Sequence, residues 1–147
     1  MNPEFIGRTY PASEPYLVGR EKIREFAAAI GDENPAYRDV VAARALGYAD
    51  VVAPPTFAIV VTMKADAAVL FDPDLGLDFS RVVHGEQHFA YTRPIVAGDE
   101  LRVVTVIENI REVAGNDMIT TRSEISTTAG EPVGVTTAIV VSRGADA

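Results

Sequence analysis

The chain has 147 residues, no cysteine and a formal net charge of −8 at pH 7. This length predicts one domain, residues 1–147, that can bury a core, and the missing cysteine excludes disulfides and thiolate metal sites. The acidic balance argues against nucleic acid or an anionic membrane as the main partner. The longest apolar run, residues 51–63, contains Pro54-Pro55 and is too short to span a bilayer, and no secretory leader is visible. We therefore expect a soluble, cytoplasmic protein.

The first part of the chain predicts an irregular arm followed by a helix. Residues 1–19 contain three prolines and read as an irregular or edge-strand arm, with Tyr10 and Tyr16 as its anchors. Residues 20–30 place their apolar side chains at helical spacing, and Gly31 is expected to end this helix because glycine accepts a left-handed conformation.

Two further helices are expected before residue 72. Asp39 is a suitable cap for a short helix over residues 40–46, with Gly47 as its stop. Residues 55–71 predict a long helix in which Pro55 takes the first position. This segment is apolar around most of its circumference, so other elements must surround it on several sides.

The second half of the chain has the alternating pattern of strands. Alternation runs through residues 86–95 and 101–108, and strands are expected again over residues 118–128 and 133–142. Gly115-Asn116 is a plausible hairpin turn, and short turns join antiparallel neighbours. The expected fold class is α+β, with an antiparallel sheet wrapped around the long apolar helix.

A polar turn between the first two helices carries the clearest chemical motif. It reads Gly31-Asp32-Glu33-Asn34-Pro35, and its Asp, Asn and Pro are residues that commonly form turns. On local chemistry alone, the turn is a helix stop, because the residue before a proline is pushed out of the helical region. Asp32 then has two possible roles, as a turn and capping residue or as a side chain that hydrogen-bonds water or substrate.

Four motifs together resemble the MaoC-like (R)-specific enoyl hydratases and 3-hydroxyacyl dehydratases. They are the turn at residues 31–39, Ala53-Pro54-Pro55-Thr56-Phe57, His84-Gly85-Glu86-Gln87, and the stretch from Arg93-Pro94 to Ala97-Gly98-Asp99. The form is closer to the N-terminal half of MaoC dehydratases, which includes the non-catalytic A-type subunit of heterodimeric (3R)-hydroxyacyl-ACP dehydratases. The resemblance covers nearly the whole chain and implies a hot-dog fold and a dimer.

The resemblance also implies which catalytic parts remain. The Asp and Asn of the family's motif fall on Asp32 and Asn34, but its catalytic His falls on Tyr37, whose phenol has a reference pKa of about 10. The family's His-Gly pair, whose glycine N–H stabilises the enolate oxygen, falls on Pro54 and Pro55, and proline has no N–H. The motif Asp32, Asn34 and Tyr37 is therefore expected to be vestigial, with the scaffold kept.

Other side chains are candidates for binding an acyl substrate. Tyr48, Thr56, Phe57 and His84 are assigned to this role by their places in or beside the motifs. Tyr37 has two interpretations, as a plug of the vestigial site or as part of an acyl channel. His84 is expected to be satisfied by the backbone at a strand end, with a rescued catalytic base as the alternative.

No metal or cofactor is expected from this chemistry. The carboxylates Asp72, Asp74 and Asp78 superficially resemble a metal cluster, but the intervening Pro73 and Gly76 favour a solvated loop, and the EF-hand pattern is incomplete.

Three hypotheses follow. The first is a dehydratase subunit in fatty-acid metabolism that shapes the acyl tunnel beside a catalytic MaoC-like chain and receives acyl-CoA or acyl-ACP. The second is an autonomous homodimeric hydratase or thioesterase, and the third is a non-catalytic acyl-ligand binding or regulatory protein. The sequence leaves open the acyl length, the carrier, the homo- or hetero-dimer and any residual activity of the chain alone.

Overall fold

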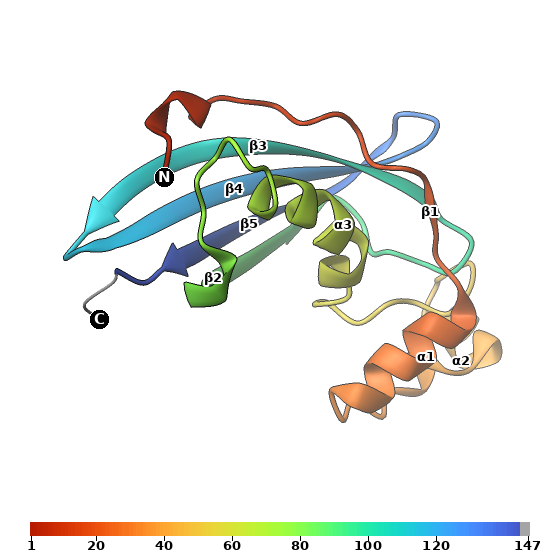
Figure 1. Ribbon diagram of the computed structural model, residues 1–147. Coiled ribbons are helices and arrows are strands. Elements are labelled where there is room, and N and C mark those ends of the chain that lie inside the picture. The colour runs from red at the N-terminus through yellow and green to blue at the C-terminus, as the bar shows by residue number, and fades with distance from the viewer. Residues whose placement is uncertain (145–147) are drawn as a thin grey trace.

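The computed structural model describes residues 1–144 as a curved antiparallel sheet that holds one helix against its concave face (Figure 1). The sheet contains β1 (Tyr16–Leu17), β2 (Val82–Tyr91), β3 (Glu100–Val113), β4 (Asn116–Thr127) and β5 (Pro132–Ser142), in the order β1-β3-β4-β5-β2. This is the expected hot-dog arrangement of an α+β domain. Because β2 forms one edge, its outer side has no strand neighbour within residues 1–144.

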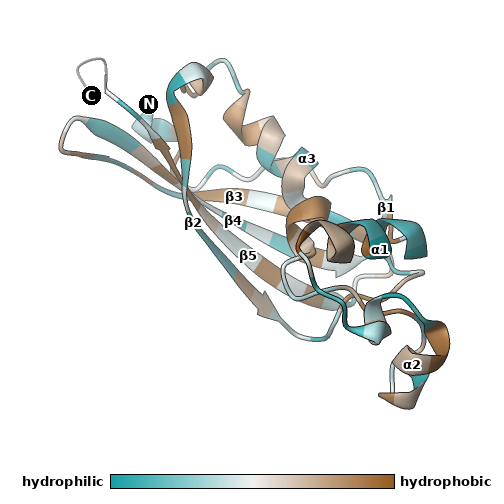
Figure 2. Cartoon of the chain, turned by 90° about the horizontal axis from the view of Figure 1, so that it is seen from below, coloured by the Kyte–Doolittle hydropathy of each residue, from teal (hydrophilic) through white to brown (hydrophobic). Residues whose placement is uncertain are grey.

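The helices gather on one side of the sheet. The central helix α3 spans Ala58–Leu70, while α1 (Arg20–Ala29) and α2 (Val40–Ala45) lie at one end, where each contacts the short turn Pro35–Tyr37 between them (Figure 1). Figure 2 shows brown apolar segments both in α3 and in the strands of the sheet. None of the helices in residues 1–144 combines the length and the apolar character that crossing a bilayer requires.

The first two helices have the expected caps. The Asp39 side chain accepts a hydrogen bond from the Val41 N–H at 2.8 Å at the start of α2, and Gly31 and Gly47 adopt positive φ values of 72° and 92° after the two helices. These contacts satisfy groups that a helix end would otherwise leave unpaired. Both helices therefore end within about one residue of the positions that the sequence predicts.

The central helix starts later than the sequence predicts. Residues 54–57 form a turn in which the Phe57 N–H donates to the Pro54 carbonyl at 2.9 Å, and α3 begins at Ala58. The assignment of Pro55 to the first helical position is therefore wrong. The N–H groups of Phe57, Ile59 and Val60 each bond to the carbonyl three residues earlier, so tight turns precede the regular α-helical bonding.

Two strand boundaries also differ from the expectation. The second strand begins at Val82 rather than residue 86 and ends at Tyr91 rather than residue 95. The β3–β4 hairpin pairs Val113 with Asn116, so the turn residues are Ala114 and Gly115, with φ values of 50° and 78°. Positive φ at both central positions is typical of a type I′ hairpin turn. The expected turn at Gly115-Asn116 is thus one residue too late.

The N-terminal arm lies along the other edge of the sheet. Tyr16 and Leu17 pair with β3, and Thr9 makes a further bridge to Val106. The Tyr10 hydroxyl donates to Asp72 Oδ2 at 2.9 Å, which ties the arm to the loop after α3. The edge-strand interpretation of the arm and the anchoring role of Tyr10 are confirmed.

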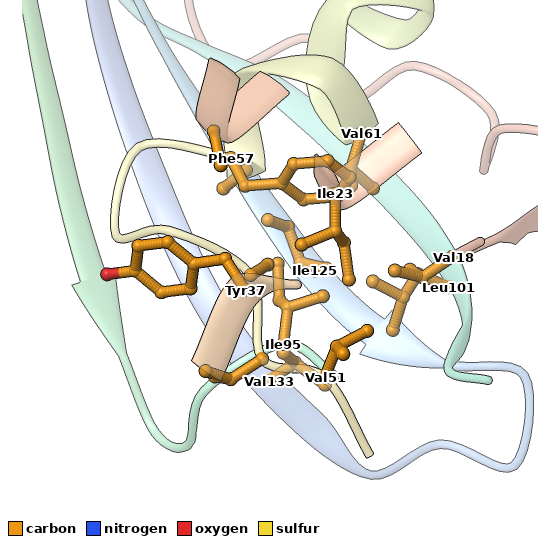
Figure 3. Close-up of a cluster of buried hydrophobic side chains, with 14 of the residues drawn as sticks. Val18, Ile23, Tyr37, Val51, Phe57, Val61, Ile95, Leu101, Ile125 and Val133 are labelled. Carbon is orange, nitrogen blue, oxygen red and sulfur yellow. The ribbon is translucent and has the colours of Figure 1, made fainter. Parts of the chain in front are cut away.

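The core has one large cluster around the start of α3. Phe57 is fully buried there and meets Phe26 of α1 edge to face, with ring centroids 5.5 Å apart. Figure 3 shows the surrounding aliphatic side chains from the arm, α1 and the strands, with Tyr37 at the edge of the cluster and its hydroxyl pointing away. The polar turn is therefore held directly on the core.

Candidate functional site

The expected catalytic turn lies at the mouth of a cavity of about 300 Å³, called the first cavity. Its lining includes Asn34, Tyr37, Tyr48, Pro54 and Pro55. The fold thus brings together most of the residues that the sequence assigns to the vestigial site. Four assigned residues lie outside its lining: Asp32, the exposed Thr56, Phe57, which is fully buried in the core, and His84.

The polar side chains of the turn bond to its own backbone. Asp32 Oδ1 accepts from the Asn34 N–H at 3.1 Å, and Asn34 Oδ1 accepts from the Ala36 N–H at 3.0 Å. The Arg38 guanidinium donates to the Asp32 carbonyl at 2.9 Å. Asp32 has the turn-forming contact and does not line the first cavity, whereas Asn34 does.

Tyr37 places a neutral phenol at the position where the resemblance implies an acid–base group. Burial raises the pKa of Tyr37 above its ordinary value, and the negative charge of Asp32 and the neighbouring Tyr48 raise it further. A phenol with a raised pKa stays protonated near neutral pH and is a poor base. The side chain nevertheless lines the cavity, so its hydroxyl can serve as a hydrogen-bonding group.

Two adjacent prolines also line the first cavity. Pro54 and Pro55 both line it, and the Pro55 carbonyl accepts a hydrogen bond from the Tyr91 hydroxyl at 2.5 Å. Proline supplies no N–H, so these two positions cannot donate a hydrogen bond to an enolate oxygen.

Arg93 also lines the first cavity, but its guanidinium is paired with two carboxylates. Its guanidinium contacts Asp99 through two nitrogens at 2.9 and 3.0 Å, and Nε donates to Glu131 at 2.8 Å. Hydrogen bonds from Arg93 to these carboxylates raise its pKa above the ordinary value. Arg93 therefore clamps the loop after β2 to the β4–β5 hairpin rather than binding an anionic ligand.

His84 lies at a second cavity, between α3 and the strands β2, β4 and β5. This second cavity has a volume of about 260 Å³ and is lined mainly by apolar atoms, with Asp66, His84 and Gln87 among its polar side chains. His84 Nε2 is 3.2 Å from Gln87 Oε1, so its partner is a side chain and the expected backbone contact is wrong. Neither Asp66 nor Gln87 is assigned to a site from the sequence, although Gln87 belongs to the quoted motif around His84.

The loop carboxylates have structural contacts. The Asp72 side chain accepts hydrogen bonds from the Tyr10 hydroxyl and from the backbone N–H of Asp74. The Asp78 side chain accepts from the Ser80 N–H and from the Arg81 guanidinium. In the part of the chain that the structure describes, His, Asp and Glu side chains form no group of three placed to hold a metal ion.

Residues 4–136 match the family model described as the FAS1-like dehydratase domain region. The chain belongs to this family. A UPF0336 protein of Streptomyces avermitilis is 56% identical to this member over 146 residues, covering 99% of this chain and 97% of that protein.

Solved structures of similar proteins share the fold of this FAS1-like dehydratase-region chain. A MaoC-like dehydratase is 40% identical with a TM-score of 0.88, covering 97% of this chain and 43% of that one. The chain thus spans less than half of that dehydratase. The HadBC (3R-hydroxyacyl-ACP dehydratase) complex from Mycobacterium tuberculosis is 31% identical, with a TM-score of 0.83 and coverage of 93% and 96%. The resemblance to MaoC-like proteins and the hot-dog fold are confirmed.

Proposed function

We propose that this chain is the non-catalytic subunit of a (3R)-hydroxyacyl thioester dehydratase or enoyl hydratase in fatty-acid metabolism. In this assembly a separate MaoC-like chain supplies the catalytic Asp and His, and this chain shapes the tunnel for the acyl tail. The observation that carries the proposal is the meeting of Tyr37 with Pro54 and Pro55 around the first cavity.

The reaction needs two kinds of group that these residues do not supply. Removing the α-proton and protonating the leaving hydroxyl require acid–base groups whose pKa values lie near the working pH. Tyr37 stays neutral near the working pH because its pKa is raised, and one carboxylate oxygen of Asp32 accepts a hydrogen bond from the turn backbone. An enolate oxygen further needs positioned N–H donors, which Pro54 and Pro55 lack.

The second cavity supports the role in binding an acyl tail. Its walls include Ile59, Met63 and Leu70 of α3 and Ala138 and Val140 of β5. Apolar walls of this kind bind a hydrocarbon chain because they remove its surface from water. Met63 and Phe71 at this face are 60% and 61% exposed in the single chain, so apolar area remains for a ligand or a partner subunit to cover.

The free edge of the sheet supports the role of a partner subunit. The outer side of β2 offers ten residues, Val82–Tyr91, next to the second cavity. An unpaired strand edge is a template for pairing with another chain. The HadBC structure is itself a complex of a dehydratase, which supports a MaoC-like partner for this chain.

The substrate in this proposal is an acyl-CoA or an acyl-ACP. With a net charge of −8, this chain would repel an acidic carrier protein, so the partner subunit or a local basic patch would receive the carrier.

The test is hydration of crotonyl and longer enoyl thioesters by the purified chain and by the complex that a tagged chain brings down from its native host. We expect negligible turnover by the chain alone and robust turnover by a complex that contains a MaoC-like chain with an intact histidine. Strong turnover by the pure chain, abolished by Asp32→Ala, would instead establish the autonomous hydratase. Saturated acyl thioesters in the same assay would reveal a thioesterase.

A further inference from the structure

The second cavity has an unexpected polar group at its wall. Asp66 lies on the central helix, whose buried side chains are apolar apart from Thr62, and its carboxyl is largely buried beside His84 and Gln87. Burying a carboxyl without a compensating role is costly, because the charged form loses its hydration. A tunnel that only accommodates hydrocarbon would be better served by an apolar residue at this position.

A β-bulge brings the other two polar side chains to the same cavity. Side chains three residues apart on a regular strand point to opposite faces, so His84 and Gln87 should be separated. The register of β2 against β5 shifts between His84 and Glu86, which inserts Gly85 as an extra residue. A Cβ at Gly85 would lie 3.0 Å from the Ile139 carbonyl oxygen, so a larger residue would press on the β5 backbone at the bulge.

The hydrogen bonds in this cluster leave one donor unpaired and hold the Asp66 carboxyl in place. Gln87 Oε1 accepts from His84 Nε2, which leaves the Gln87 amide nitrogen; that nitrogen is buried and has no hydrogen-bond partner within residues 1–144. A buried donor without a partner destabilises the folded chain, so it requires an explanation. Ser123 donates to Asp66 Oδ1 at 3.0 Å and lies 2.7 Å from Thr105 Oγ1, so a hydroxyl chain fixes the carboxyl.

We infer that Asp66, His84 and Gln87 form a polar subsite that binds an oxygen atom, a hydroxyl or a carbonyl, carried along the acyl chain of the ligand. This inference rests on the proposed function, since it names the class of acyl chain that the second cavity accepts. The Gln87 amide donates to the oxygen, and Asp66 in its neutral form donates from its O–H. Burial favours that neutral form by raising the pKa of Asp66.

The predicted preference is for oxygen-bearing chains over plain hydrocarbon chains. A plain chain would leave the Gln87 donor unpaired and would press methylenes against Asp66, whereas an oxygen at the matching position satisfies both. Recognition of this kind discriminates well because the buried polar groups of the site are left unpaired by the wrong ligand.

The experiment compares binding of decanoyl-CoA with hydroxydecanoyl-CoA and oxodecanoyl-CoA isomers that carry the oxygen at successive positions in the distal half of the chain. Binding is measured by calorimetry on the full chain and on its complex with the catalytic partner. The variants are Asp66→Asn, which keeps a hydrogen-bonding group, Asp66→Leu and Gln87→Leu, which remove one, and Asp74→Leu, an exposed loop control. Circular dichroism confirms that each variant is folded.

We expect one oxygenated isomer to bind about tenfold more tightly than decanoyl-CoA to the wild-type chain and to the Asp66→Asn and Asp74→Leu variants. The Asp66→Leu and Gln87→Leu variants should lose this preference and still bind decanoyl-CoA.

Equal binding of all ligands by the wild-type chain, or an unchanged preference in Asp66→Leu, would overturn the inference and leave the proposed function standing. Binding that occurs in the free chain and vanishes in the complex would mean that a partner side chain fills the subsite, which also overturns it. If no acyl ligand binds in either form, the acyl tunnel itself is contradicted. If the pure chain proves to be an active hydratase, the proposed function fails while the ligand preference can still be observed.

Discussion

The Ser123 hydroxyl on β4 lies 3.0 Å from the Asp66 carboxylate oxygen on α3, so a hydrogen bond joins the sheet to the central helix beside the second cavity. The hydroxyl lowers the pKa of Asp66, yet burial is the larger effect and the pKa is raised overall. The native state therefore disfavours the charged carboxylate relative to the unfolded chain.

Asp66→Asn is expected to stabilise the protein near neutral pH. Because the native pKa of Asp66 is raised, the folded state holds the carboxyl proton more tightly than the unfolded state does. The free energy of unfolding of the wild type therefore falls as pH rises from the unfolded pKa of about 4 through the native pKa. Asparagine does not titrate and avoids this loss. Urea unfolding should show a gain for Asp66→Asn at neutral pH that shrinks below about pH 3, where both states of the wild type are protonated. An equal gain at both pH values would contradict the ionisation account.

Ala114→Asn is expected to raise the free energy of unfolding by about 0.5–1 kcal/mol. Ala114 adopts a φ of 50° in the β3–β4 turn, and asparagine tolerates the left-handed region better than alanine does. Ala129→Asn is the matched control, because this exposed turn residue has no positive φ. Chemical denaturation of both variants checks the prediction, and a similar change in the two would rule out the backbone explanation.

Arg93→Lys is expected to lower the free energy of unfolding by about 1–3 kcal/mol. Lysine cannot reproduce the two-nitrogen contact with Asp99 together with the contact to Glu131, so the largely buried Asp99 carboxylate would lose donors. Arg102→Lys, at an exposed position on β3, serves as the control and should change little. Unaltered thermal unfolding of the Arg93 variant would show that the clamp contributes nothing.

Tyr37→His is expected to remain inactive in the enoyl-thioester hydration assay. The substitution returns an imidazole to the first cavity, but Pro54 and Pro55 still lack the N–H that an enolate oxygen needs. A circular dichroism spectrum identical to that of the wild type would show that the fold is intact. Measurable turnover by this single variant would mean that the missing donor is not limiting.

Much of the fold follows from local sequence chemistry. Asp39, Gly31 and Gly47 mark helix ends where the structure has them, and alternation marks β3, β4 and β5. The start of α3 could not be placed, because Pro55 suits a first helical position while the following turn depends on how residues 54–57 pack. The start of β2 was missed because the pattern is interrupted at the Gly85 bulge, which depends on packing against β5.

The candidate site was predicted in part for a similar reason. Asn34, Tyr37 and Tyr48 come from one stretch of sequence, and the fold places them on the first cavity as a group. Asp66 and Gln87 belong to a different helix and strand, and Gln87 faces His84 only because of the bulge. The one local signal was Asp66 itself, a carboxylate in a helix that is apolar around most of its circumference.

The measurement that tests the central claim most directly is turnover of the complex after the vestigial motif of this chain is removed. In the first complex, this chain carries Asp32→Asn together with Tyr37→Phe, which keeps the ring that packs on the core. In the second complex, the catalytic histidine of the MaoC-like partner is replaced by alanine. The account predicts kcat within about twofold of wild type for the first complex and a loss of at least about a hundredfold for the second. A comparable loss in the first complex would contradict it, because this chain would then take part in the chemistry.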